Sequence, residues 1–169
     1  MKKPKVHTEQ QEQLVERLTR IPSLIVEHHD NPALSRVVLA EICQCFGIER
    51  SAYFVDNPDF DHFVGAAGYD RNDVHSLATI TDQPPSQLHD AVQQLLETSQ
   101  KRKNTDAGES EILKQLAQTI GIANPAVMTW DMKHGNHGVL VFEPELPDTK
   151  LKELFKRALS LLGLCPINR

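Results

Sequence analysis

Residues 38–55 read VLAEICQCFGIERSAYFV, and residues 112–130 repeat the same pattern as ILKQLAQTIGIANPAVMTW. In each copy, apolar residues at helical spacing lead to a glycine followed by isoleucine, at Gly47 and at Gly121. A stretch rich in β-branched and aromatic residues follows within a few positions, as a strand requires. A helix that leads into a β-hairpin, used twice, predicts a sheet covered by helices.

The N-terminal region contains a further helical pattern over residues 8–28, where Pro22 is expected to kink or break the helix. Asn31 and Pro32 then signal the start of a second helix, with Asn31 as its cap, and this helix ends at Gly47. The apolar stripe of the first helix consists of Leu14, Leu18, Ile21 and Ile25.

The rest of the chain alternates between strand patterns and helix patterns. The predicted strands are residues 51–55, 60–67, 77–81, 127–132 and 138–143. The predicted later helices are residues 88–99, residues 112–120 and a final helix that Asp148 caps and Gly163 stops. Because hairpins form antiparallel pairs, this order predicts an α+β fold with a central antiparallel sheet of about five to six strands and helices on its faces.

Composition narrows the classes of partner. The 169 residues are most simply one domain, and a net charge of −5 without a dense basic stripe gives no reason to expect nucleic acid. No apolar run approaches the roughly 20 residues that span a bilayer, and the N-terminus lacks the apolar region of a secretory signal. Three cysteines, an odd number, do not make a disulfide framework. We therefore expect a cytoplasmic protein with no membrane partner.

Two stretches carry a likeness to a known family. They are LAEICQCFGIERSAYFVDNPDFDHFVGAAGYD near the front and ANPAVMTWDMKHGNHGVLVFEPELPDTKLKELFKRAL near the end. Their layout resembles a GAF domain, a small regulatory module of bacterial signalling proteins. The first hairpin closes on Gly68 after two alanines, the last strand starts at Gly138 with Val-Leu, and a closing helix follows. The resemblance implies an N-terminal helical segment over residues 1–30 and a GAF-like domain over residues 31–165.

The resemblance also implies a function. A GAF-like module would regulate a signalling system by binding a small molecule or by mediating dimerisation, and its terminal helices would form a homodimer. A ligand-free scaffold for protein contacts is one alternative, and a thiol-dependent reductase of the same fold is another. The residue sets of cyclic-nucleotide-binding and bilin-binding members are absent, so the resemblance transfers no site residue. Cys43 and Cys45 lie on a predicted helix and Cys165 near the end of the chain, unlike the loop cysteines of the reductases.

Candidate site residues therefore come from their chemistry alone. No nucleophile elbow or phosphate-binding loop is present, and His134 and His137 are too few for a metal site, so no enzyme, cofactor or metal is expected. A ligand pocket would lie between the sheet and the segment from Tyr69 to Leu96. The polar and aromatic residues expected to line it are Tyr53, His62, Tyr69, Trp130 and Asp131.

Overall fold

The computed structural model describes residues 5–31, 33–57, 62–72, 87–94, 96–98, 115, 117–132 and 135–165. Its helices are α1 (Lys5–Glu27), α2 (Leu34–Phe46), α3 (Gln87–Gln93), α5 (Thr149–Leu159) and the 3-10 helix η4 (Ser160–Leu164). Its strands are β1 (Arg50–Asn57), β2 (His62–Asp70), β3 (Leu96–Thr98), β4 (Ala126–Asp131) and β5 (His137–Glu143). The strand predicted over residues 77–81 lies outside the described residues.

The strands form one sheet in the order β3-β2-β1-β5-β4, and every neighbouring pair is antiparallel. The predicted α+β class and antiparallel sheet are therefore confirmed. Both predicted hairpins form, as β1–β2 and as β4–β5. They join in the centre of the sheet, where β1 pairs with β5 from Arg50↔Glu143 to Asp56↔His137.

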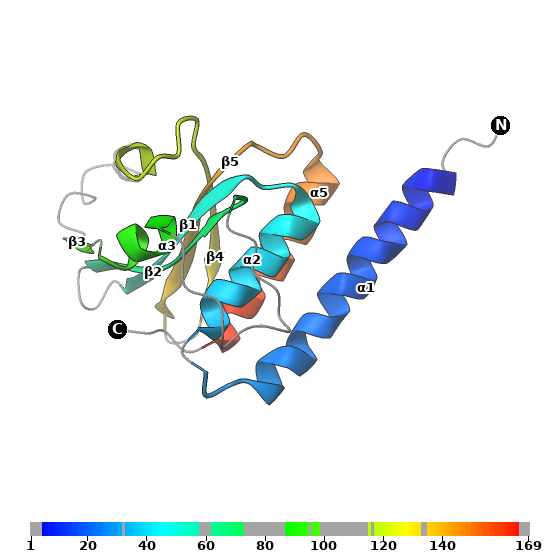
Figure 1. Cartoon of the computed structure of the whole chain (residues 1–169), viewed down its shortest axis with the longest axis horizontal. Coiled ribbons are helices and arrows are strands. Elements are labelled where there is room, and N and C mark those ends of the chain that lie inside the picture. The colour runs from blue at the N-terminus through cyan, green and yellow to red at the C-terminus, as the bar shows by residue number, and fades with distance from the viewer. Residues whose placement is uncertain are drawn as a thin grey trace.

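The two faces of the sheet carry separate apolar cores. Figure 1 shows how the helices are arranged around the sheet. The larger core lies under α1, α2, α5 and η4, and we call this side the helix face. The smaller core lies under α3, and we call that side the α3 face. Its buried members are Ala52, Phe54, Leu88, Val92, Ala117, Ile122, Val139 and Val141.

Local sequence signals end α2 and begin α5 as predicted. Gly47 adopts a left-handed φ of 71°, and its N–H donates to the carbonyls of Cys43 and Gln44 at the end of α2. Asp148 accepts a hydrogen bond from the backbone N–H of Lys150 at 2.8 Å and so caps α5.

The N-terminal predictions need two corrections. Helix α1 runs without a break through Pro22, because Ile21 and Ile25 on either side of it are buried in the helix-face core. Helix α2 begins at Leu34 and has Ala33 rather than Asn31 in the cap position. Asn31 instead forms a turn just before the helix, in which its side chain accepts from Ala33 N at 2.9 Å.

Two further corrections concern the middle of the chain. Residues 96–98, predicted as part of a helix, form β3 because they pair with β2 at positions 62–64. Strand β2 also continues to Asp70, beyond the predicted end at residue 67. It contains a bulge, where Tyr53 faces Ala67 and Phe54 faces Gly65, so Ala66 is the extra residue.

Candidate functional site

Three of the predicted site residues are in the helix-face core. Tyr53 is fully buried, Tyr69 is 1% exposed and Trp130 is 4% exposed. The rings of Tyr53 and Trp130 stack with centroids 5.7 Å apart, and the Tyr53 hydroxyl donates to Met132 Sδ at 3.8 Å. Burial raises the pKa of both tyrosines, to about 12 for Tyr69, so their hydroxyls stay protonated at neutral pH.

The other two predicted residues lie elsewhere. Asp131 follows Trp130 in β4, so its side chain points to the opposite face, where it is 94% exposed. It contacts its register partner His137, with Oδ1 3.2 Å from Nδ1. His62 belongs to β2, and its side chain lies outside the described part of the structure.

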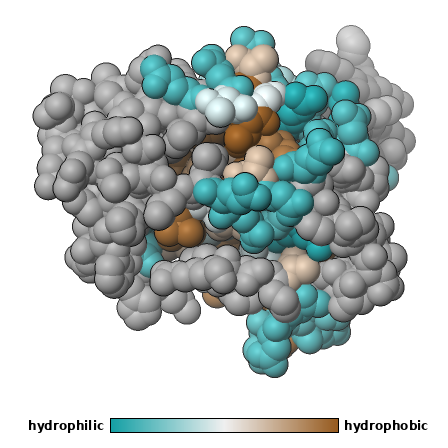
Figure 2. All heavy atoms as spheres, turned by 60° about the vertical axis from the view of Figure 1, so that its left-hand side comes forward, coloured by the Kyte–Doolittle hydropathy of each residue, from teal (hydrophilic) through white to brown (hydrophobic). Residues whose placement is uncertain are grey.

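The pocket predicted beneath the segment from Tyr69 to Leu96 would lie on the α3 face, since α3 packs there. Figure 2 brings the α3 side of the molecule forward and shows apolar side chains toward its centre with polar ones around them. Tyr53, Tyr69 and Trp130 lie on the other side of the sheet. Among the residues that the structure describes, the predicted set does not converge on one site.

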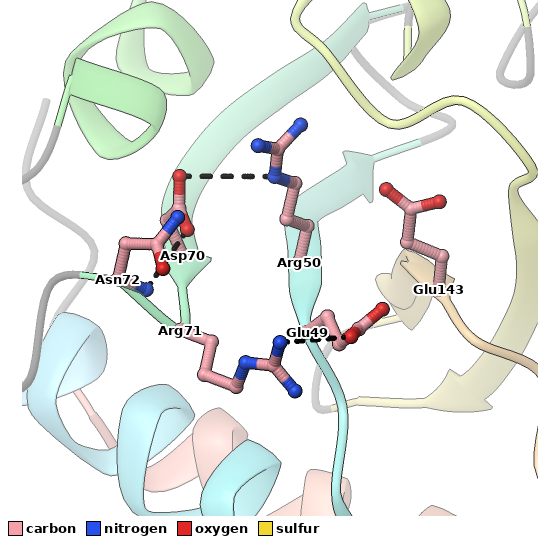
Figure 3. A pocket seen from close by; sticks show the side chains of 6 residues that line it. All are labelled: Glu49, Arg50, Asp70, Arg71, Asn72 and Glu143. Carbon is pink, nitrogen blue, oxygen red and sulfur yellow. Dashed lines mark hydrogen bonds and ion pairs between the residues drawn. The ribbon is translucent and has the colours of Figure 1, made fainter.

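A polar pocket that the sequence did not indicate lies at one end of the sheet (Figure 3). It has a volume of about 160 Å³. Arg50, at the start of β1, is flanked by its register partners Asp70 and Glu143, so all three side chains project from the α3 face. The lining residues are Glu49, Arg50, Asp70, Arg71, Asn72 and Glu143.

The charged groups of this pocket already bind other parts of the fold. Arg50 Nη1 donates to the Gly121 carbonyl at 2.6 Å, and Arg50 Nε lies 3.8 Å from Asp70 Oδ2. Arg71 Nη2 lies 3.0 Å from Glu49 Oε1, and Glu143 Oε2 accepts from Asn124 N at 3.2 Å. The pocket therefore anchors the segment leading into β4, and a ligand would have to carry both charge signs to replace these contacts.

The cysteines are poorly suited to thiol chemistry. Cys43 and Cys165 are buried, and Cys45 is half-buried. Burial raises the pKa of Cys43 and of Cys165 to about 12 and that of Cys45 to about 11. Because the thiolate is the nucleophile, these three thiols are almost entirely in their unreactive form at neutral pH.

The exposed apolar side chains are concentrated on terminal elements. In the described ranges, the large hydrophobic residues that remain exposed are Val15 (50%), Val26 (72%) and Leu164 (49%). Val15 and Val26 are on α1, and Leu164 is on η4, which contacts α1. Val15 and Val26 are 11 residues apart, which is about three helical turns, so they share one side of α1. We call this side the valine face.

The valine face differs from the stripe that motivated the dimer prediction. Ile21 and Ile25 of that stripe are buried, and Leu18 packs against the same core. Arg17 also fixes α1 to α2, because its Nε and Nη2 donate to Glu41 Oε1 at 3.0 and 2.7 Å. The larger stripe therefore holds α1 on its own domain, and the valine face is left exposed.

Comparison of the sequence with known protein families found no match, and a search of curated proteins also found none. None of the helices in the described ranges combines the length and apolar character needed to cross a membrane. In the same ranges, no three His, Cys, Asp or Glu side chains come together in a way that could hold a metal ion.

Proposed function

We propose that this chain is a GAF-like regulatory module that works as a homodimer, with the valine face of α1 as its association surface. The element order supports the GAF-like part of the proposal: α2 leads into the β1–β2 hairpin, and the β4–β5 hairpin leads into the closing helix α5. The observation that carries the dimer is the placement of Val15 and Val26 on one exposed side of α1. Exposed apolar side chains on one side of a helix offer surface that a protein partner can cover.

The spacing of the two valines favours a second copy as the partner. In a two-fold symmetric interface, residue i of one subunit meets residue j of the other, and j meets i. Two antiparallel α1 helices would place Val15 of each subunit against Val26 of its partner copy. Figure 1 shows α1 at the edge of the molecule, with one long side directed away from the sheet and the other helices.

The matched test replaces both valines by glutamate. The Val15→Glu/Val26→Glu protein should sediment as a monomer where the parent sediments as a dimer, because burying a carboxylate costs at least about a tenfold loss of affinity per site. The control is Gln13→Glu, which adds one negative charge, against two in the double variant, at an exposed position on a different side of α1. A double variant that dimerises as tightly as the control would contradict the proposal.

Ligand binding is a second candidate, favoured by the polar pocket at the strand ends. Its size of about 160 Å³ and its two charge signs fit a small zwitterion such as an α-amino acid. An amino acid at about 100 times its Kd should add about 2.7 kcal/mol to the free energy of unfolding in a thermal-shift measurement. Arg71→Gln should abolish that shift, and a panel of amino acids that leaves the parent unshifted would rule this candidate out.

The thiol-reductase alternative has less support. Its nucleophile would have to be one of three cysteines whose pKa values are all raised to about 11 or above. A ligand-free scaffold would dimerise through the valine face and would bind no ligand in the strand-end pocket. The amino-acid panel distinguishes such a scaffold from a ligand-binding module.

A further inference from the structure

Helix α3 is fastened to the backbone of β2 by two of its own side chains. The Gly68 N–H donates to His89 Nδ1 at 3.1 Å in a buried hydrogen bond. Next to it, Gln93 Nε2 donates to the carbonyl of the bulge residue Ala66 at 3.5 Å. The shorter of these two bonds depends on the protonation state of a histidine that is only 5% exposed.

The contact between α3 and β2 leaves no space for adjustment. A Cβ atom on Gly68 would lie 2.9 Å from both His89 Cα and the Leu88 carbonyl oxygen. A Cβ on Gly65 would overlap the carbonyl of Val92. The backbone of the helix therefore rests directly on the strand, and the imidazole is buried at this contact.

We propose that His89 is a pH-sensitive latch that holds α3 on β2. A neutral imidazole can accept at Nδ1 while its proton is on Nε2, whereas an imidazolium carries a proton on both nitrogens. Protonation thus removes the acceptor and sets two N–H groups against each other in a buried site. The proton can bind only when α3 lifts from the sheet, so falling pH favours the lifted state.

The charged side chains on α3 and on the elements near it have both signs. Carboxylates stabilise a charged imidazole and guanidiniums destabilise it, so together they set the pH at which α3 is released from β2. The cause of the release remains the loss of the acceptor at His89 Nδ1. In the described part of the chain these charged side chains include Asp90 on α3, Arg36 on α2 beside Asp90, Arg50 and Asp56 on β1, and Asp70 on β2.

Hydrogen exchange of the Gly68 amide tests this inference in the unmodified protein. Its protection factor should fall about tenfold per pH unit below about pH 6.5, the ordinary pKa of an exposed histidine. The amide of Val141, in the centre of the sheet, should hold its protection factor over the same range. Equal falls at Gly68 and Val141, or no fall at Gly68, would overturn the latch.

A pair of variants assigns the effect to His89. His89→Gln retains a side-chain acceptor that does not titrate, so the pH dependence at Gly68 should disappear. His137→Gln removes a histidine that is exposed on β5, and the pH dependence should then remain. A Gly68 amide that responds to pH equally in both variants would refute the assignment.

Discussion

Replacing Gly65 by alanine should lower the free energy of unfolding by at least about 3 kcal/mol. The added Cβ would overlap the backbone carbonyl of Val92, and a backbone group cannot move aside as a flexible side chain can. Helix α3 would have to rise from β2, which would expose Val92 and Leu88 and weaken the bonds at Gly68 and Ala66. Urea denaturation followed by circular dichroism measures the change.

Gly163→Ala is the matched control for this substitution. A Cβ on Gly163 would meet Met132 Cε at 3.6 Å, which is ordinary van der Waals contact. Since Gly163 is in η4, the same substitution there should change stability by less than about 1 kcal/mol. Comparable losses at residues 65 and 163 would show that α3 does not rest on β2 as closely as described.

Replacing Gly138 by alanine should destabilise the protein by about 2 to 4 kcal/mol and should move its only tryptophan. Gly138 is the register partner of Trp130, and the indole ring lies across the space that a Cβ would fill. The ring would have to swing away, losing its stacking on Tyr53 and its burial.

Tryptophan fluorescence follows this displacement directly because the chain contains a single tryptophan. In the Gly138→Ala protein, the emission maximum under native conditions should shift to longer wavelength as the indole becomes hydrated. Gly163→Ala again serves as the control and should leave the emission unchanged. An unshifted spectrum together with parental stability would contradict the packing of Trp130 on Gly138.

The elements that could be predicted are those with local causes. Gly47 ends α2 through its own backbone conformation, and Asp148 caps α5 through its own side chain. Both hairpins follow from short runs of β-branched and aromatic residues. Strand β3 was missed because residues 96–98 become a strand only by pairing with residues 62–64, a contact that local periodicity does not contain.

The candidate site was harder to predict because it depends on which faces are covered. Side chains alternate between the two faces along a strand, and Tyr53 and Trp130 lie on the same face of the sheet. The sequence does not say that α2 and α5 pack on that face. The strand-end pocket joins Arg50 and Glu143, which become neighbours only through the β1–β5 pairing.

The valine face illustrates the same limit on α1. The larger stripe from Leu14 to Ile25 dominates the helical periodicity, so it attracted the dimer prediction. Only the packing of Ile21 and Ile25 into the domain core shows that much of that stripe is occupied within the chain. The exposed positions are then Val15 and Val26, which periodicity alone does not distinguish from other surface residues.

Sedimentation equilibrium of the unmodified chain, from about 1 to about 100 µM, tests the proposed association most directly, because a dimer's population depends on protomer concentration. The mass should approach twice the 19.0 kDa of one chain at the upper concentrations and decline on dilution. A constant mass of 19.0 kDa across the whole range would contradict the valine face as a self-association surface.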